Sequence, residues 1–438
     1  MRLRPWWYRI VGPSGVALAI LAGGPLAAAG WGGEPLDAGL LATAPEVLVA
    51  AIPLPPDPPL PPAGIELLPP TDPEEETVSE PTLSSEPAVT ADESPVDEPS
   101  SVATVLPPSP AVPPYPLVVN PPVEALIDYF RARERERFSL WLARSGRYLD
   151  MIRQVFRERG LPEELAYTAM IESGFWPRAA SRVGARGLWQ FMEATARRYG
   201  LTVNRWVDER LDPVKSTVAA AQYLGDLYEM FGHWFLAQAA YNAGEARVAL
   251  AIKRAKTSDF WALTQTRHLP NETKRFVPQI LAAMVITREP ARYGFEVAQE
   301  APLAYDEIVV RRVLDLPTIA ALADVPVEAI RELNPALRGG ITPPFSAYAL
   351  RLPLGSGARF ETALAETPAW RLPHWKIHRV QRGQSLAQIA RLYRTTPQRL
   401  AEVNALRGGQ LRGVSELVVP VSIRRPVADG DRLAAPTP

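Results

Sequence analysis

A long proline-rich segment separates the start of this chain from its folded part. The chain has 47 prolines, about twice average usage, and they are concentrated between Pro53 and Pro122. The same stretch carries many acidic residues between Asp72 and Glu98. Such a segment cannot bury enough apolar surface to offset its ordering entropy. We therefore expect residues 30–118 to form a disordered, semi-stiff linker, with the folded domains after it.

Composition excludes several classes of site. Cysteine is absent, which rules out disulfides, thiolate metal sites, a cysteine nucleophile and a lipid-modified N-terminal cysteine. There are four histidines and none forms a close pair, so a catalytic zinc site is not expected. The net charge of −1 offers no case for a nucleic-acid partner. We expect neither a metal nor an organic cofactor.

The first 29 residues resemble a secretory signal peptide. Arg2, Arg4 and Arg9 supply a positive start, Val16–Ala22 a short apolar core, and Leu26–Ala29 small residues that suit cleavage. The apolar core is far shorter than the ~20 residues that span a bilayer. We expect export to the periplasm or cell envelope, as a protein that is not a lipoprotein. An uncleaved signal segment is the alternative, and the only membrane association we expect.

Helical periodicity begins abruptly at Asn120. Val123, Leu126, Ile127 and Phe130 recur at helical spacing, and no alternating strand pattern occurs between Val123 and Arg292. We predict a mainly α protein with an all-α domain at residues 119–297. Further helices are predicted at 148–159, 161–171, 193–199, 214–231, 235–240, 246–255 and 272–287.

An internal repeat follows this domain. Residues 315–334 and 385–404 align without a gap, and both copies end in asparagine, Asn334 and Asn404. Strand-like stretches flank each copy, at 308–313 and 347–352 for the first and at 377–380 and 416–419 for the second. The pattern predicts two small α+β (βααβ) modules at residues 305–355 and 375–422. Residues 423–438 are expected to be a disordered tail.

Glu172 is the candidate catalytic residue. It lies in the stretch Ala-Met-Ile-Glu-Ser-Gly-Phe, and on a helix starting near Leu161 it would share one face with Leu165 and Ala169. A carboxyl group at the end of an apolar face is partly desolvated, which raises its pKa and suits a general acid. A structural glutamate, held by a buried arginine or a backbone amide, is the alternative.

Four motifs in order resemble the soluble-lytic-transglycosylase type of catalytic domain. They are Glu172–Phe175, Gly187–Met192, Ala240–Gly244 and Glu272–Thr273. The resemblance implies a lysozyme-like fold that cleaves peptidoglycan, with Glu172 as the only acid/base. It further implies substrate contacts from Ser173, Ser181, Gln190, Met192, Tyr241 and Asn242. The sequence departs from that pattern at Glu193, where proline is usual, and at Phe276, where tyrosine is usual.

The second repeat resembles the LysM module, which binds glycans containing N-acetylglucosamine. The resemblance covers His378–Pro420 and includes Val380–Leu386. The first repeat has Leu314–Pro317 where such modules carry Gly-Asp/Gln-Ser/Thr-Leu. It is interpreted as a degenerate module, and whether it binds glycan is left open.

The resemblance implies a lytic transglycosylase that acts on peptidoglycan strands. It would cleave the MurNAc-β-1,4-GlcNAc bond and leave 1,6-anhydromuramyl ends, and we expect a monomer. One alternative is a lysozyme-type hydrolase in which Asp208 or Asp212 holds a water. Another is a catalytically weak cell-wall-binding protein, favoured by Phe276. A glycan-sensing partner in a larger envelope complex is a third.

Overall fold

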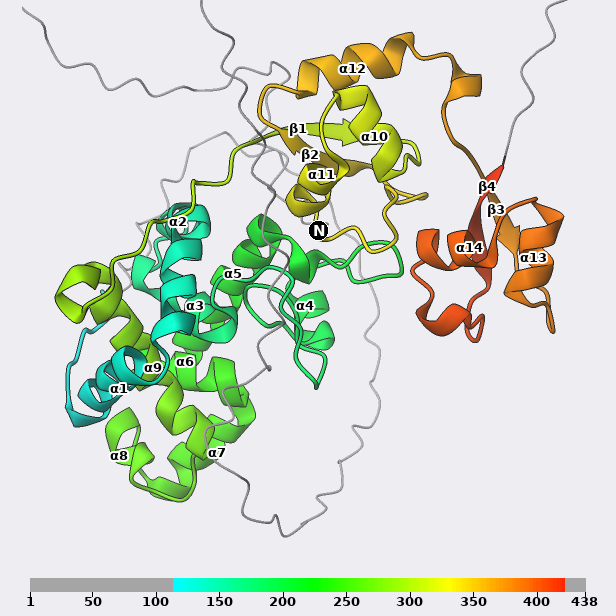
Figure 1. Ribbon diagram of the computed structural model, residues 1–438. Coiled ribbons are helices and arrows are strands. Elements are labelled where there is room, and N and C mark those ends of the chain that lie inside the picture. Colours follow the sequence, from blue (N-terminus) through cyan, green and yellow to red (C-terminus); the bar gives the residue numbers. More distant parts are fainter. Residues whose placement is uncertain (1–112, 422–438) are drawn as a thin grey trace, which may run out of the picture. The chain divides into compact units, whose positions relative to one another are not determined.

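The computed structural model describes residues 113–421 (Figure 1). The predicted signal segment, the linker as far as residue 112 and the predicted tail lie outside these residues. Residues 113–118, which the sequence analysis assigned to the linker, pack on the helical part instead. Tyr115 is buried and its hydroxyl donates to Gln238. Trp234 Nε1 donates to the Pro113 carbonyl at 3.0 Å.

The mainly α fold class is confirmed. The region that follows Tyr115 is a bundle of helices, coloured cyan to green in Figure 1. Its α-helices are α1 (Pro121–Ala132), α2 (Arg135–Arg157), α3 (Tyr167–Ser173), α4 (Glu193–Arg198), α5 (Pro213–Phe231), α6 (Trp234–Ala243), α7 (Glu245–Ala255), α8 (Phe260–Thr264) and α9 (Asn271–Arg288). Its 3₁₀ helices are η2 (Glu163–Ala166), η3 (Glu209–Leu211) and η4 (Pro290–Tyr293).

Capping residues explain where two of these helices begin. The Asn120 side chain accepts from the Val123 amide at the start of α1. Asp212 does the same for α5, accepting from the amides of Val214 and Lys215 at 2.9 Å. In both helices the first position is proline, whose fixed φ and missing N–H suit a first turn.

One predicted helix is wrong. Residues 161–171 were expected to form a single helix, but the structure has the 3₁₀ turn η2 followed by the short helix α3. The apolar face expected for Leu165, Ala169 and Glu172 is therefore split between two elements. Leu165 and Ala169 are nonetheless fully buried, so the apolar surroundings of Glu172 remain.

Helix α3 lies in the apolar core of the bundle. Helix α3 packs against α9, α9 packs against α1 and α6, and α6 packs against α5. Large side chains such as Trp189, Phe156 and Met170 are fully buried in this core. Because α3 packs against α9 and η2, its last residues have a defined position at the edge of the core.

Two small modules follow the bundle, and each contains a two-stranded antiparallel sheet. In the first, β1 (Tyr305–Val310) pairs with β2 (Tyr348–Pro353), around α10 (Leu316–Ala323) and α11 (Val327–Leu333). In the second, β3 (His374–Arg379) pairs with β4 (Glu416–Val421), around α13 (Leu386–Leu392) and α14 (Pro397–Val403). The other elements are α12 (Gly357–Glu366), η5 (Ala369–Arg371) and η6 (Arg407–Gly409).

The predicted strand–helix–helix–strand order is present in both copies. The first strand lies three residues earlier than the expected 308–313, because β1 pairs with β2 in the register Tyr305–Pro353 to Val310–Tyr348. Helix α12 was not predicted. It packs on α10 and buries Phe360. The described residues of the second module contain no equivalent helix.

The repeated asparagines have the same structural role in both modules. Asn334 Nδ2 donates to the Ile330 and Arg351 carbonyls at 2.8 and 2.6 Å, and its Oδ1 accepts from the Arg351 amide. Asn404 makes the equivalent bonds to Leu400 and Val418 at 2.7–2.9 Å. Each asparagine is buried and ties the second helix to the second strand. The matched contacts confirm the internal repeat.

The bundle and the first module belong to one compact unit. Val207 of the bundle is buried in the apolar core of the first module. The Asp208 amide donates to the Ala336 carbonyl at 2.9 Å, and Asp212 forms a 3.0 Å ion pair with Arg351. We name residues 204–212, which make these contacts, the carrier segment.

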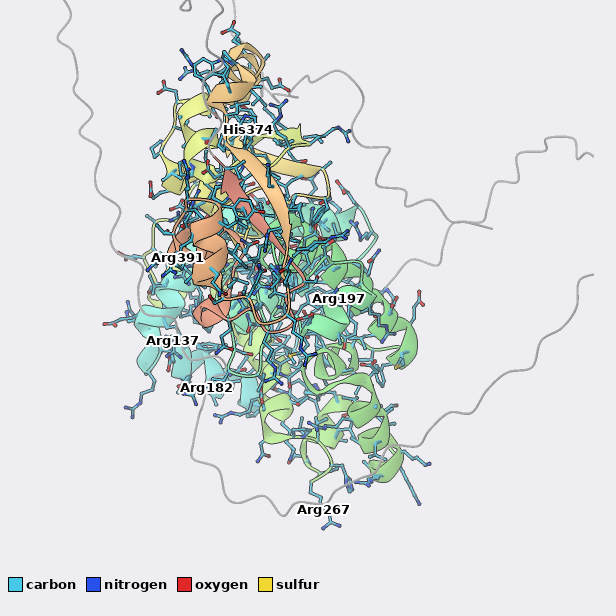
Figure 2. The ribbon with its side chains drawn as sticks, turned by 90° about the vertical axis from the view of Figure 1, so that its right-hand side faces the viewer. Arg137, Arg182, Arg197, Arg267, His374 and Arg391 are labelled. Carbon is cyan, nitrogen blue, oxygen red and sulfur yellow. The ribbon has the colours of Figure 1, made fainter. Side chains whose placement is uncertain are left out.

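Exposed arginines are common on the described surface. Arg267 and Arg391 are exposed, and Arg267 projects outward at the lower end of Figure 2. Between residues 113 and 421 no helix combines the length and the apolar character needed to cross a bilayer.

Candidate active site

Glu172 occupies the last turn of α3. The helix ends at Gly174, which adopts a left-handed conformation with φ 59°. A Cβ built on Gly174 would lie 2.1 Å from the Trp141 ring, so only glycine permits this close approach. Phe175, which follows, has a φ of 56° and is fully buried. The chain therefore turns sharply just after Glu172, in a conformation that costs energy for a residue with a side chain.

The environment of Glu172 favours its protonated form. Its side chain is partly exposed, and it has no ion-pair or hydrogen-bond partner among residues 113–421. Burial, and second the negative charge of Glu272, raise the pKa of the Glu172 carboxyl to about 8. Near neutral pH most molecules therefore hold a proton on this carboxyl, as a general acid requires.

A loop formed by residues 184–192, the site loop, is held against α3. Ser173 Oγ, on the residue after Glu172, donates to the Leu188 carbonyl at 2.8 Å. The Tyr241 hydroxyl on α6 donates to the next carbonyl, of Trp189, at 2.7 Å. Burial, then the charge of Glu172, raise the pKa of Tyr241 well above its usual value, so this phenol stays a neutral donor.

The other predicted site residues lie on or beside this loop. Gln190 has a φ of 47° and its Nε2 donates to the Gly187 carbonyl at 2.9 Å. Met192 is 45% exposed just before α4. Ser181 closes the preceding turn, where its Oγ accepts from the Ala185 amide at 2.9 Å. Ser173 is buried and hydrogen-bonded to backbone, so its hydroxyl holds the loop and does not face solvent.

Asn242 joins α6 to the start of α9. Its Nδ2 lies 3.4 Å from Glu272 Oε1, and its Oδ1 accepts from the Thr273 hydroxyl at 2.7 Å. Glu272 is exposed and Thr273 is buried. This network holds the Glu272 carboxylate beside Glu172, a contribution that the sequence analysis missed. The motif Glu272–Thr273 was its only signal.

The two departures from the resembled pattern have different surroundings. Glu193 is the first residue of α4 and forms an ion pair with Arg197 at 2.9 Å. A carboxylate suits a helix N-terminus as well as proline does. Phe276 is 4% exposed in the bundle core, one turn after Glu272 on α9. Its ring therefore serves packing.

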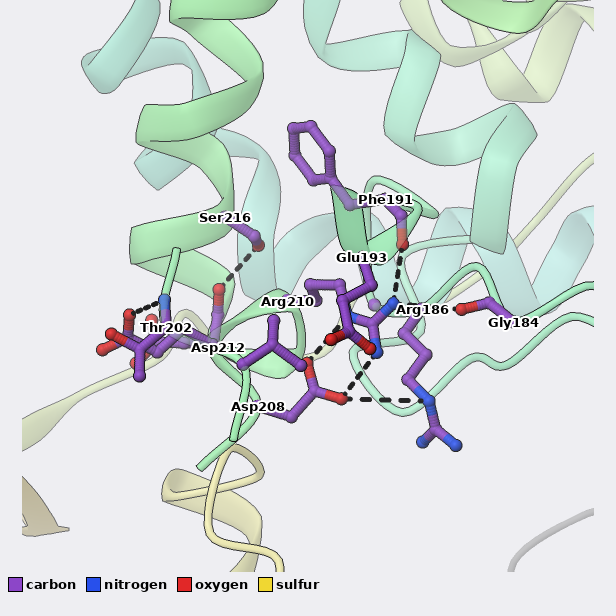
Figure 3. Close-up of polar contacts among 12 residues, drawn as sticks. Gly184, Arg186, Phe191, Glu193, Thr202, Asp208, Arg210, Asp212 and Ser216 are labelled. Carbon is purple, nitrogen blue, oxygen red and sulfur yellow. Dashed lines mark hydrogen bonds and ion pairs between the residues drawn. The ribbon is translucent and has the colours of Figure 1, made fainter. Parts of the chain in front are cut away.

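Asp208 and Asp212 are the candidate water-binding residues of a hydrolase, and both carboxylates are already bound to other groups of the protein. Asp208 is fully buried and accepts from Arg210 Nε and Nη2 at 2.8 and 2.9 Å (Figure 3). Asp212 caps α5 and pairs with Arg351. Arg210 itself was missed by the sequence analysis, although its position between two aspartates was a signal.

Three family models match parts of the chain. The transglycosylase SLT domain matches residues 151–264. The LysM-like domain of lytic transglycosylase MltD matches residues 304–369. The LysM domain matches residues 378–420. The first match contains the site loop and Glu172, and the other two coincide with the repeated modules.

Curated relatives and a solved structure are also similar to parts of this chain. Membrane-bound lytic murein transglycosylase D from Escherichia coli is 33% identical over 296 residues, which are 63% of this chain and 64% of the relative. A putative tributyltin chloride resistance protein from an Alteromonas species is 41% identical over 26% of this chain and 56% of its own. The solved lytic transglycosylase Slt from Pseudomonas aeruginosa, an inactive mutant, is 26% identical, with a TM-score of 0.29 over 34% of this chain and 25% of that one.

The chain thus spans 64% of the length of the E. coli relative that it matches. The matched residues include the Glu172 turn, the site loop and both repeats. The chain combines matches to the transglycosylase SLT domain, the LysM-like domain of lytic transglycosylase MltD and the LysM domain, and it is similar to membrane-bound lytic murein transglycosylase D.

Proposed function

We propose that this protein is a lytic transglycosylase that cleaves the glycan strands of peptidoglycan at Glu172. The observation that carries the proposal is the state of the Glu172 carboxyl: partly exposed, without a cation partner in the described structure, and with a pKa of about 8. A structural glutamate would have an arginine or backbone amide as partner. The SLT match over residues 151–264 supplies the reaction class.

The proposed chemistry uses one carboxyl group twice. Protonated Glu172 gives its proton to the leaving oxygen of the MurNAc-β-1,4-GlcNAc bond as that bond breaks. The substrate's own N-acetyl group stabilises the positive charge that develops at C1, as in substrate-assisted glycosidases. The Glu172 carboxylate then takes the proton from the C6 hydroxyl of the same sugar, whose oxygen closes on C1. The product carries a 1,6-anhydromuramyl end and no water is consumed.

The structure disfavours the hydrolase alternative. An inverting or retaining hydrolase uses a second carboxylate that can activate water or attack carbon. Asp208 and Asp212 have their oxygens engaged by Arg210, Arg351 and backbone amides. Glu272 is the carboxylate that influences Glu172, but it is held through Asn242. Its negative charge fits the task of keeping Glu172 protonated.

The remaining assignments form part of the same proposal. Tyr241, Gln190, Met192, Asn242 and Ser181 would contact the glycan, and Ser173 would position the site loop. The domain would extend over residues 119–297, followed by modules at 305–355 and 375–422. The second module would bind N-acetylglucosamine-containing glycan and raise the effective concentration of the site on the polymer. We propose action in the periplasm or cell envelope, by a monomer that needs no metal or organic cofactor.

Digestion of purified peptidoglycan tests this proposal. The protein and its Glu172→Gln variant are incubated with sacculi, and the soluble fragments are analysed by mass spectrometry. Fragments lighter by one water molecule than their hydrolysed forms, absent with the variant, are the expected result. Reducing ends of full hydrolysed mass would establish a hydrolase instead. Sacculus binding without release by either protein would establish a binding protein.

A further inference from the structure

The guanidinium group of Arg210 joins two segments that flank the proposed site. Arg210 is 4% exposed, on η3 within the carrier segment. Its Nε and Nη2 donate to both oxygens of Asp208. Its Nη1 donates to the carbonyls of Gly184 and Phe191 at 3.0 and 3.2 Å. Figure 3 shows these bonds converging on one side chain from both ends of the site loop.

The two carbonyls that Arg210 binds belong to Phe191, at the end of the turn that carries Gln190, and to Gly184, two residues before that turn begins. Arg186 and Phe191 exchange backbone hydrogen bonds at 3.0 and 3.1 Å, which closes this turn. The middle of the turn is held by Ser173 and Tyr241. Arg210 therefore supplies a third anchor, which is charged, and Arg186 of the site loop adds a longer ion pair of 3.8 Å to Asp208.

Close packing adds to this attachment. Gly187 has a φ of 85°, and a Cβ built on it would lie 1.8 Å from the Arg210 carbonyl oxygen. The site loop thus rests directly on the Arg210 backbone while the Arg210 side chain holds its ends. A shift of Arg210 must move the loop with it.

The carrier segment is in turn held by the first module. The Asp208 amide donates to the Ala336 carbonyl, and the Arg338 amide donates to the Trp206 carbonyl, both at 2.9 Å. Val207 is buried among the apolar residues of that module. The position of Arg210 therefore depends on contacts that the SLT domain does not make by itself.

We propose that Arg210 is a positioning residue that fixes the site loop relative to Glu172. Because the first module holds the carrier segment in place, it also sets the position of Arg210 and, through Arg210, that of the site loop. The inference rests on the proposed function and deepens it, because the site loop would carry the glycan contacts Gln190 and Met192. On this view the first module is a structural part of the catalytic unit.

The substitution Arg210→Lys, made in the full chain, is the main test. Lysine keeps the charge, but its single ammonium cannot bind both Asp208 oxygens and two carbonyls as a planar guanidinium does. We expect kcat/KM on peptidoglycan, per folded molecule, to fall on the order of tenfold to a hundredfold. Hydrogen exchange of the Arg186 and Phe191 amides should become on the order of tenfold faster. Arg157→Lys, at an exposed arginine paired with Glu163, is the matched control and should change neither quantity.

A second variant covers the possibility that Arg210→Lys does not fold. Asp208→Asn keeps the shape of the carboxylate but removes the charge that pairs with Arg210 and, at 3.8 Å, with Arg186, and it should give the same two changes to a smaller extent. If either folded variant exchanges these amides at the wild-type rate, or keeps wild-type kcat/KM, Arg210 is not a positioning residue. Absence of product from the wild-type protein would overturn the proposed function, while the exchange measurement would still decide the role of Arg210.

Discussion

Asp212 caps helix α5 and at the same time forms an ion pair of 3.0 Å with Arg351 on strand β2. Both side chains are more than nine-tenths buried. One carboxylate therefore caps the start of a bundle helix and also binds the sheet of the first module. The bundle and the module share a polar contact in addition to their apolar one at Val207.

Removing Arg351 should destabilise the protein strongly. Arg351→Met leaves the buried Asp212 charge without its partner, which typically costs about 3–5 kcal/mol. Adding Asp212→Asn to that variant should restore part of the loss, because asparagine still caps α5 but carries no charge. Urea unfolding of the single and double variants measures both effects. Equal stability of the wild type and Arg351→Met would show that this pair contributes nothing.

Glu172 should make the free energy of unfolding fall as the pH rises from acid to mildly alkaline values. Its folded pKa of about 8 lies above its value of 4.5 in a free side chain, so the folded state binds the proton more tightly. Stability is therefore lost as the pH rises from about 4.5 towards 8. Glu172→Gln has no such proton to lose.

We expect Glu172→Gln to be more stable than the wild type at pH 8, on the order of 1–3 kcal/mol. The difference should shrink towards pH 4, where both the folded and unfolded carboxyls are protonated. Thermal or urea unfolding at several pH values measures it. A variant that is less stable at pH 8 would indicate that the Glu172 carboxylate has a structural partner after all.

The pH dependence of activity should reveal the influence of Glu272. If Glu172 must be protonated to start the reaction, kcat/KM falls above a pH of about 8, since the pKa of Glu172 is raised to about 8. Burial is the larger cause of this raised pKa and the negative charge of Glu272 the smaller one. Glu272→Gln removes the smaller cause, so the alkaline limb should move part of the way to lower pH. Glu272→Asp keeps the charge and serves as the control. An alkaline limb in the same place for all three proteins would exclude this electrostatic role.

Gly187 and Gly184 offer a matched pair in the site loop. Both have positive φ, 85° and 92°, so alanine at either position costs about 1–2 kcal/mol in backbone conformation. Only at Gly187 would the new Cβ also collide with the Arg210 carbonyl oxygen; at Gly184 nothing lies within 4 Å. We expect Gly187→Ala to be the more destabilising by at least another 1–3 kcal/mol, measured by denaturant unfolding. Equal losses would show that the loop can move away from Arg210.

Most of the secondary structure followed from local pattern. Helix α5 and α9 lie within one or two residues of their predicted ranges, because their apolar periodicity and boundary residues are strong local signals. The helix expected at 161–171 was wrong, because the break between η2 and α3 depends on how both pack in the core. Strand β1 was displaced by three residues, because its register is set by the partner β2 and not by its own sequence.

The sequence alone identified Glu172, the motif order and the duplicated asparagines, since each is a matter of residue type and spacing along the chain. The tertiary structure decided three contacts between segments that lie far apart in the sequence. It placed Glu272 close enough to add to the raised pKa of Glu172, it brought the Gly184 and Phe191 carbonyls to Arg210, and it paired Asp212 with Arg351 across 139 residues. Burial and charge act through space, so these contacts exist only once distant segments have packed together.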